Sequence, residues 1–281
     1  MTKLTDIFST RELSLLIWLT VLIITLTFGK EIRKSMLGVI SAFFATKIVL
    51  VFALLTIYVG LIVFLLKSFS LLDVTLFKDT IFWFFSFAIV TFFSINKAKD
   101  IGFFKSILVD SFKWTIFLEF LVNFYTFSLT TELILFPFIL IVTTTQAFSQ
   151  TDKKNEQVTK LLTNILSIIV TAYFLYALYK TLFDYKNVFT LHNLNSLVLP
   201  LLLTTLLLPF YYLLAVIMQY EELFIRADFM TNDKNKSKLL KREILMTAKF
   251  NLNKIKTIKT NLNKFDFYHS TDIKQYIKTI K

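Results

Sequence analysis

The sequence contains no cysteine and very little glycine or proline: of its 281 residues, 4 are glycine and 3 are proline. The absence of cysteine excludes a disulfide framework, a thiolate nucleophile, an iron–sulfur site and a zinc ribbon. The four glycines are scattered along the chain, so none of the glycine-rich loops that bind phosphate groups is present. The sequence therefore lacks the motifs of the common nucleotide-dependent and thiol-dependent enzymes.

Histidine is also scarce. The two histidines, His192 and His269, are predicted to lie in an outer loop and in the C-terminal tail. This excludes an intramembrane haem held by two histidines and an H-E-x-x-H metalloprotease. There is no G-x-S-x-G nucleophile motif, and the last long apolar run lacks the lysine that a retinal Schiff base requires. We therefore expect a protein that is not an enzyme and that needs no cofactor and no metal.

Apolar residues are abundant and occur in long uncharged runs. Hydrophobic residues make up 56% of the chain, and 33 residues are phenylalanine. Because a bilayer core about 30 Å thick requires about 17–25 helical residues, such runs predict transmembrane helices. Seven runs are found, at residues 13–28, 48–66, 80–95, 112–128, 132–148, 161–179 and 197–218. The third is short and flanked by charges, so we expect it to tilt little or to be partly re-entrant. The predicted fold is an all-α polytopic membrane protein.

The distribution of lysine and arginine predicts the orientation in the membrane. Most of these residues lie in the loops 29–47, 96–111 and 149–160 and in the tail, which are all on one side if seven runs cross. The positive-inside rule places that side in the cytoplasm and the N-terminus outside. The composition, rich in Phe, Ile, Lys and Asn, is typical of an AT-biased bacterial genome, so we expect the bacterial inner membrane.

Two regions are predicted. Residues 1–218 form a transmembrane bundle, with short amphipathic helices in its cytoplasmic loops, and residues 219–281 form a basic, helical cytoplasmic tail. The tail contains 14 basic and 7 acidic residues. Its apolar residues recur every three or four positions, if Asn251 is counted as a polar member of the pattern. This spacing predicts a single helix with one apolar seam, formed by Ile244, Ala248, Ile255, Ile258, Leu262 and Phe265.

Lysines surround this seam and form the predicted binding surface of the tail: Lys249, Lys254, Lys256, Lys259 and Lys264. Three interpretations are open. The tail could dock on the anionic lipids of the inner leaflet or on its own loops, it could form a coiled coil that makes a homo-oligomer, or it could bind nucleic acid. We do not expect the third, because only Arg226 and Arg242 could make bidentate contacts with bases.

Polar residues inside the apolar runs are the candidates for a path through the membrane. Glu119 lies in the middle of the fourth run, with Asn123 one turn later on the same helix face. Two interpretations of Glu119 and Asn123 are open. They could form a gate or proton relay, or they could form hydrogen bonds between helices. Asn164 is expected to form hydrogen bonds with the polar residues 143–146 near the end of the fifth run. Thr205 and Pro209 form a polar notch in the last run, which predicts a hinge or a tolerated kink.

Together these features favour a multi-pass inner-membrane protein without catalysis. It would act as a membrane anchor or as a membrane-perturbing effector, of the general kind found in bacterial defence systems, and its basic cytoplasmic face would receive a cytoplasmic protein partner. One alternative is a secondary transporter or ion channel with Glu119 in its path. Another is an oligomeric scaffold assembled through the tail.

Overall fold

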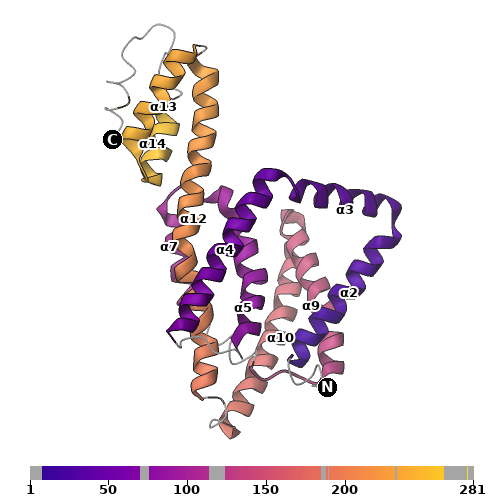
Figure 1. Ribbon diagram of the computed structural model, residues 1–281. Helices are drawn as coiled ribbons and strands as arrows, with labels where there is room; N and C mark the ends of the chain where they lie inside the picture. The colour runs from indigo at the N-terminus through magenta and orange to yellow at the C-terminus, as the bar shows by residue number, and fades with distance from the viewer. Residues whose placement is uncertain are drawn as a thin grey trace. The chain divides into compact units, whose positions relative to one another are not determined.

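The computed structural model describes residues 8–69, 76–113, 124–184, 190–231 and 233–262, together with Val188 and Ile277, and every regular element in these segments is helical (Figure 1). Six helical segments are long and apolar enough to cross a membrane. These are α2 (Thr10–Phe28), α4 (Thr46–Ser68), the segment Phe77–Lys97, α9 (Leu129–Ser149), α10 (Glu156–Phe183) and α12 (Leu191–Thr231). They coincide with six of the seven predicted runs, which supports a polytopic membrane protein. The other run, 112–128, lies mostly outside the described residues.

The chain divides into two compact units, residues 1–53 with 114–194 and residues 54–113 with 195–281. In the first unit, α2 begins with a capping box formed by Ser9 and Glu12. The Ser9 hydroxyl accepts a hydrogen bond from the Glu12 amide at 3.3 Å, and the Glu12 carboxylate accepts one from the Ser9 amide at 2.7 Å. These bonds satisfy amide groups that a helix start otherwise leaves unpaired. After Gly29, the amphipathic helix α3 (Lys30–Phe43) continues the chain.

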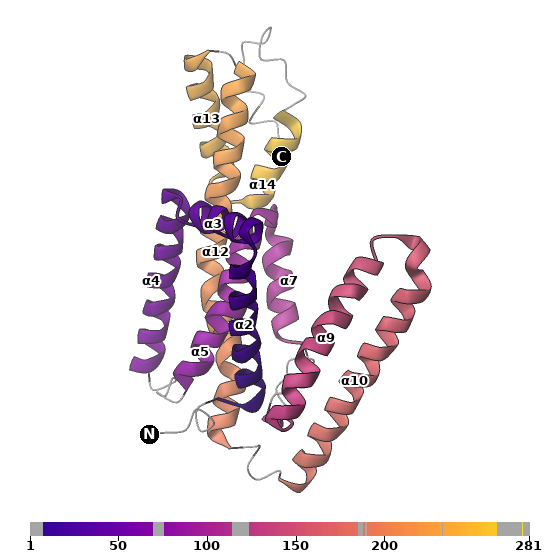
Figure 2. The same ribbon diagram turned by 90° about the vertical axis from the view of Figure 1, so that its right-hand side faces the viewer.

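The core of the first unit is an antiparallel hairpin of α9 and α10, joined through the short helix η4 (Lys153–Asn155) (Figure 2). At the turn, the hydroxyls of Ser149 and Thr159 lie 2.7 Å apart. Helix α2 packs along α9, where the indole nitrogen of Trp18 donates to the Leu133 carbonyl at 2.9 Å. The unit is therefore held by hydrogen bonds between helices as well as by apolar packing.

In the second unit, the predicted third span is one helical segment built from four pieces. These are α5 (Phe77–Trp83), the π-helical turn η2 (Phe84–Ala88), α6 (Ile89–Ser94) and the 3-10 turn η3 (Ile95–Lys97). Its 21 residues are enough to cross a membrane. The buried hydroxyl of Tyr211 on α12 donates to the carbonyl of Ala88 at the end of the π turn. The Trp83 indole donates to Thr204 at 3.0 Å, so α12 holds both sides of the irregular turn.

Helix α12 is 41 residues long, which corresponds to about 60 Å. A membrane core about 30 Å thick covers only half of that length. The helix runs without a break through residue 218, the predicted boundary between bundle and tail. The tail is therefore attached to the membrane region by a continuous helix and not by a linker.

Two further helices, α13 (Lys234–Ala248) and α14 (Leu252–Leu262), fold back beside the C-terminal half of α12 (Figure 1). This corrects the prediction of one continuous seam helix, because the chain leaves the helical conformation at residues 249–251. The apolar seam residues from Ile244 to Leu262 are nevertheless buried, whereas Asn251 is exposed and Phe265 lies outside the described residues. Helix α7 (Ile101–Ser111) follows the third span and begins next to α14.

Candidate membrane-interface site

The tail forms a folded three-helix arrangement, here called the tail module: α13, α14 and α12 from Tyr212 onward. Seven apolar residues on the inner faces of α13 and α14 are at most 1% exposed, namely Leu240, Ile244, Ala248, Leu252, Ile255, Ile258 and Leu262. Facing them, α12 contributes a buried stripe at helical spacing: Val216, Tyr220, Leu223 and Ala227. Burial of each large aliphatic side chain stabilises such a module by about 1.5–3 kcal/mol.

Ion pairs fix the direction of each tail helix. Near the end of α12, the carboxylate of Asp228 accepts hydrogen bonds from Ser237 at 2.5 Å and from Lys241 at 2.7 Å, both on α13. One and a half turns earlier, Glu222 accepts a hydrogen bond from Lys259 on α14. Glu222 also pairs with Arg226, four residues later on the same helix, at 2.9 Å. These contacts make α13 antiparallel and α14 parallel to α12.

Two tyrosines attach the turn between α13 and α14 to α12. The hydroxyl of Tyr220 donates to the Lys249 carbonyl at 2.5 Å, and the hydroxyl of Tyr212 donates to the Phe250 carbonyl at 2.7 Å. The turn is therefore held at two consecutive carbonyl groups.

The backbone of the turn is strained at Lys249, which has φ 48° and ψ −124°. This region is accessible to glycine but costly for a residue with a Cβ atom, by about 1–3 kcal/mol. The tyrosine hydrogen bonds and the buried neighbours Ala248 and Leu252 hold the turn in this conformation. Lys249 is thus held in a backbone conformation that is energetically unfavourable for a lysine.

The five predicted binding lysines divide into different environments. Lys256 donates to Asp100 at 2.7 Å, and Lys259 bonds with Gln219 and Glu222, so both serve the internal structure of the module. Lys249 and Lys254 are exposed, one on each side of Phe250. Lys264 lies outside the residues that the structure describes. Of the four described lysines in this set, Lys249 and Lys254 are therefore the two that are exposed without a bond to Asp100 or Glu222.

A hollow of about 650 Å³ surrounds this turn. Residues 246–254 line it, together with Tyr212 of α12 and Ile101 of α7. Two apolar side chains of the turn region point outward: Phe250 is 69% exposed and Met246 is 49% exposed. The arrangement combines two ammonium groups with an exposed aromatic ring, which suits an anionic amphiphilic ligand.

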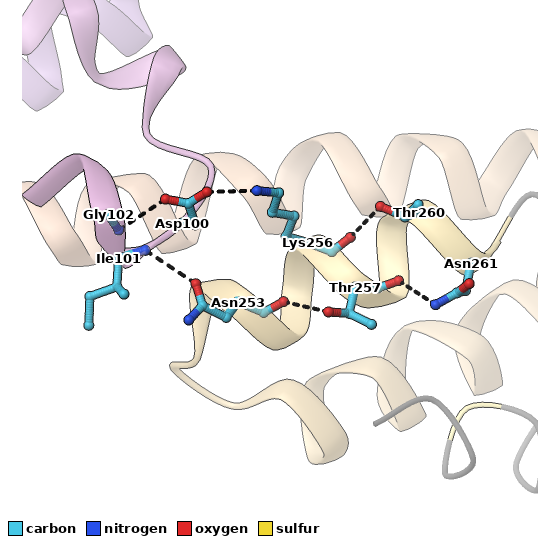
Figure 3. A pocket seen from close by; sticks show the side chains of 8 residues that line it. All are labelled: Asp100, Ile101, Gly102, Asn253, Lys256, Thr257, Thr260 and Asn261. Atoms are coloured by element: carbon cyan, nitrogen blue, oxygen red, sulfur yellow. Dashed lines mark hydrogen bonds and ion pairs between the residues drawn. The ribbon is translucent and has the colours of Figure 1, made fainter.

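A second hollow, of about 530 Å³, lies between α7 and α14 (Figure 3). Its polar side chains bond to each other or to their own helices. Asp100 caps α7 by accepting from the Gly102 amide at 3.0 Å, and the Asn253 side chain accepts from the Ile101 amide at 3.3 Å. The Lys256 ammonium lowers the pKa of the Asp100 carboxyl through a hydrogen bond. The residues around this hollow therefore connect the loop 96–111 to the tail.

A buried polar cluster in the first unit was not predicted from the sequence. The carboxylate of Glu132, in the first turn of α9, accepts from Arg11 of α2 at 3.3 Å, from Tyr173 of α10 at 3.3 Å and from the Phe127 amide at 3.1 Å. The Arg11 guanidinium also lies 4.8 Å from the centre of the Tyr173 ring. Glu132 is almost completely buried, and its contacts join the starts of α2 and α9 to α10.

Tyr173 is buried in this cluster. The sequence offered one signal, which is that Arg11 and Glu132 both lie at the start of an apolar run.

The predicted intramembrane residues are only partly within the described structure. Glu119 and Asn123 lie outside it. Asn164 is exposed on α10, and the Gln146 amide donates instead to Thr163 at 2.8 Å, one residue earlier. The expected contact between the fifth and sixth runs is therefore present, but Thr163 makes it and not Asn164.

The polar notch of α12 faces outward. Thr205 is exposed and donates to the Leu201 carbonyl of its own helix at 2.8 Å, while Pro209 is exposed one turn later. The buried threonine is Thr204, which accepts from Trp83. On the notch side, Tyr58 of α4 donates to the Leu206 carbonyl at 3.1 Å. The notch therefore makes helix contacts and does not open into the interior of the second unit.

Comparison with known proteins adds no family to this description. The chain matches no protein-family model, no curated protein and no solved structure.

Proposed function

We propose that this chain is a non-catalytic, multi-pass protein of the bacterial inner membrane, with seven crossings, an outer N-terminus and a cytoplasmic tail module that receives a protein partner. The observation that carries the proposal is the continuity of α12, which joins an apolar stretch long enough to span the membrane to the folded basic module. A force on the module would reach the membrane region directly. The protein would act as an anchor or as a membrane-perturbing effector.

The contact between α7 and α14 supports this orientation. The positive-inside rule assigns the loop 96–111 and the tail to the same side of the membrane. In the second unit these two parts touch each other through Asp100 and Lys256 and through Ile101 and Asn253. The agreement between charge and geometry favours a cytoplasmic location for both.

Single-cysteine labelling tests the topology, because the natural chain has no cysteine. Lys238→Cys, on the exposed side of α13, should react with a membrane-impermeant maleimide only after the cells are opened. Thr130→Cys, at the start of α9, should react in intact cells. Labelling of both positions from the same side would overturn the seven-crossing arrangement, and labelling of Lys238→Cys in intact cells would overturn the cytoplasmic tail.

Purified protein in liposomes separates the possible activities. An anchor should leave both a trapped dye and ion gradients intact, whereas a membrane-perturbing effector should release the dye. An ion flux that is abolished by Glu119→Gln, with Glu132→Gln as a second carboxylate variant, would replace the proposal with the transporter or channel alternative.

A further inference from the structure

The most informative surface of the molecule is the turn of the tail module, because its height along α12 is known. The Phe250 carbonyl is bonded to Tyr212, which lies six residues before the end of the apolar run 197–218. The Lys249 carbonyl is bonded to Tyr220, which lies two residues after the end of that run, so the two bonds of the turn lie on either side of its predicted cytoplasmic end. The turn therefore lies at the level of the membrane interface and not far above it.

The side chains of the turn fit such a location. Phe250 and Met246 are large apolar residues that the protein itself leaves largely exposed. Lys249 and Lys254, one on each side of Phe250 in the sequence, are exposed, whereas Lys256 and Lys259 are held by Asp100 and Glu222. An apolar tip between lysines is the pattern of surfaces that insert at the boundary between lipid headgroups and acyl chains.

The hollow beside the turn supplies a place for a headgroup. Its lining includes Lys249, Lys254 and Tyr212, together with Ile101 of α7. The nearby carboxylate of Asp100 is paired with Lys256. The strained backbone at Lys249 keeps this lysine beside Phe250.

We propose that the turn 246–254 is a binding site for an anionic phospholipid of the inner leaflet, with Phe250 and Met246 inserted among the acyl chains and Lys249 and Lys254 bound to the headgroup phosphate. The inference rests on the proposed cytoplasmic position of the tail. It deepens that proposal by assigning the lipid contact to one turn, and it leaves the remaining surface of the module to a protein partner.

Depth measurements on the full chain test the insertion. A nitroxide label is attached to Phe250→Cys, and Phe229→Cys is the matched control. Phe229 is also highly exposed, at 82%, but it lies 17 residues beyond Tyr212 on α12, which is about 25 Å further along the helix towards its cytoplasmic end. In nanodiscs with 30% phosphatidylglycerol, a label at 250 should collide more with oxygen than with a water-soluble nickel complex. A label at 229 should show the reverse.

Lipid retention tests the role of the lysines. Native mass spectrometry of the full chain should show preferential retention of phosphatidylglycerol over phosphatidylcholine. Replacing Lys249 and Lys254 with glutamine should lower this preference about tenfold or more, as expected for two lysines at a lipid surface. The control pair Lys234→Gln and Lys238→Gln removes the same charge at the far end of α13 and should change little.

The outcomes are distinct for the two proposals. Equal water accessibility at 250 and 229, or an equal loss of lipid preference in the two double variants, would overturn the lipid site while the topology stands. Labelling of Lys238→Cys from outside the cell would overturn the cytoplasmic tail itself.

Discussion

Helices α3 and α14 share a sequence pattern but differ in what covers their apolar faces. Both are short, basic and amphipathic. In α14 the apolar residues are at most 1% exposed, because α12 and α13 cover them. In α3 no residue is buried, and Val39 and Ile40 are 70% and 45% exposed. The pattern therefore predicts that a face is apolar, but not whether protein or lipid covers it.

The largest expected difference comes from truncating one isoleucine in each helix. Ile255→Ala in α14 should lower the free energy of unfolding of the tail module by about 2–5 kcal/mol, because the side chain is fully buried and its removal leaves a cavity. Ile40→Ala in α3 should change the stability of the protein by no more than about 0.5 kcal/mol. Hydrogen exchange of the full chain in nanodiscs, followed for each helix, measures both effects.

Equal effects of the two substitutions would contradict this comparison. A large loss of protection around α3 in Ile40→Ala would show that α3 is covered by protein in the membrane-embedded state. A small loss in Ile255→Ala would mean that the module does not depend on the packing of α14.

The second prediction concerns the strained turn that α14 has and α3 lacks. Lys249→Gly should stabilise the tail module by about 1–2 kcal/mol, because glycine adopts φ 48° without the clash of a Cβ atom. Lys249→Ala is the control, since it removes the same charge but keeps the strain. Slower hydrogen exchange of α13 and α14 in the glycine variant alone would support the interpretation, and no difference between the variants would contradict it.

Much of the helical layout could be predicted from the sequence. Runs of apolar residues located six segments that are long enough to cross, because length and hydropathy alone decide whether a helix can span a bilayer. The capping box at Ser9 and the salt bridge between Glu222 and Arg226 depend only on spacing within one helix, so they are open to prediction from the sequence as well. The break at Lys249 is not, because it depends on bonds from Tyr212 and Tyr220, far away in sequence.

The candidate sites were less predictable for the same reason. Arg11 and Glu132 are 121 residues apart, and only the packing of α2 against α9 brings them together. The tail lysines all looked alike in sequence, but Asp100 engages Lys256, and Glu222 engages Lys259. Tertiary contacts therefore decide which lysines can bind a ligand, and the helical periodicity of the sequence does not.

The smallest expected effect concerns the ion pair that joins α14 to α7, a contact for which α3 has no described counterpart. The pKa of Asp100 is lowered in the folded protein by the hydrogen bond from Lys256, so the pair contributes its full stability above the unfolded pKa of about 4. The contribution is lost as the pH falls through the lower, folded pKa. Because both side chains are partly exposed, it should not exceed about 1 kcal/mol.

Hydrogen exchange at the start of α7, compared between pH 6 and pH 3 after correction for the intrinsic rate, measures this contribution. Asp100→Asn should remove the acid-dependent part, because asparagine still caps the helix but cannot form the ion pair. Lys241→Gln removes the corresponding lysine from Asp228 on α13 and should leave the acid response of α7 unchanged. An acid response of α7 that persists in Asp100→Asn would show that another group, and not this ion pair, couples the loop to the tail.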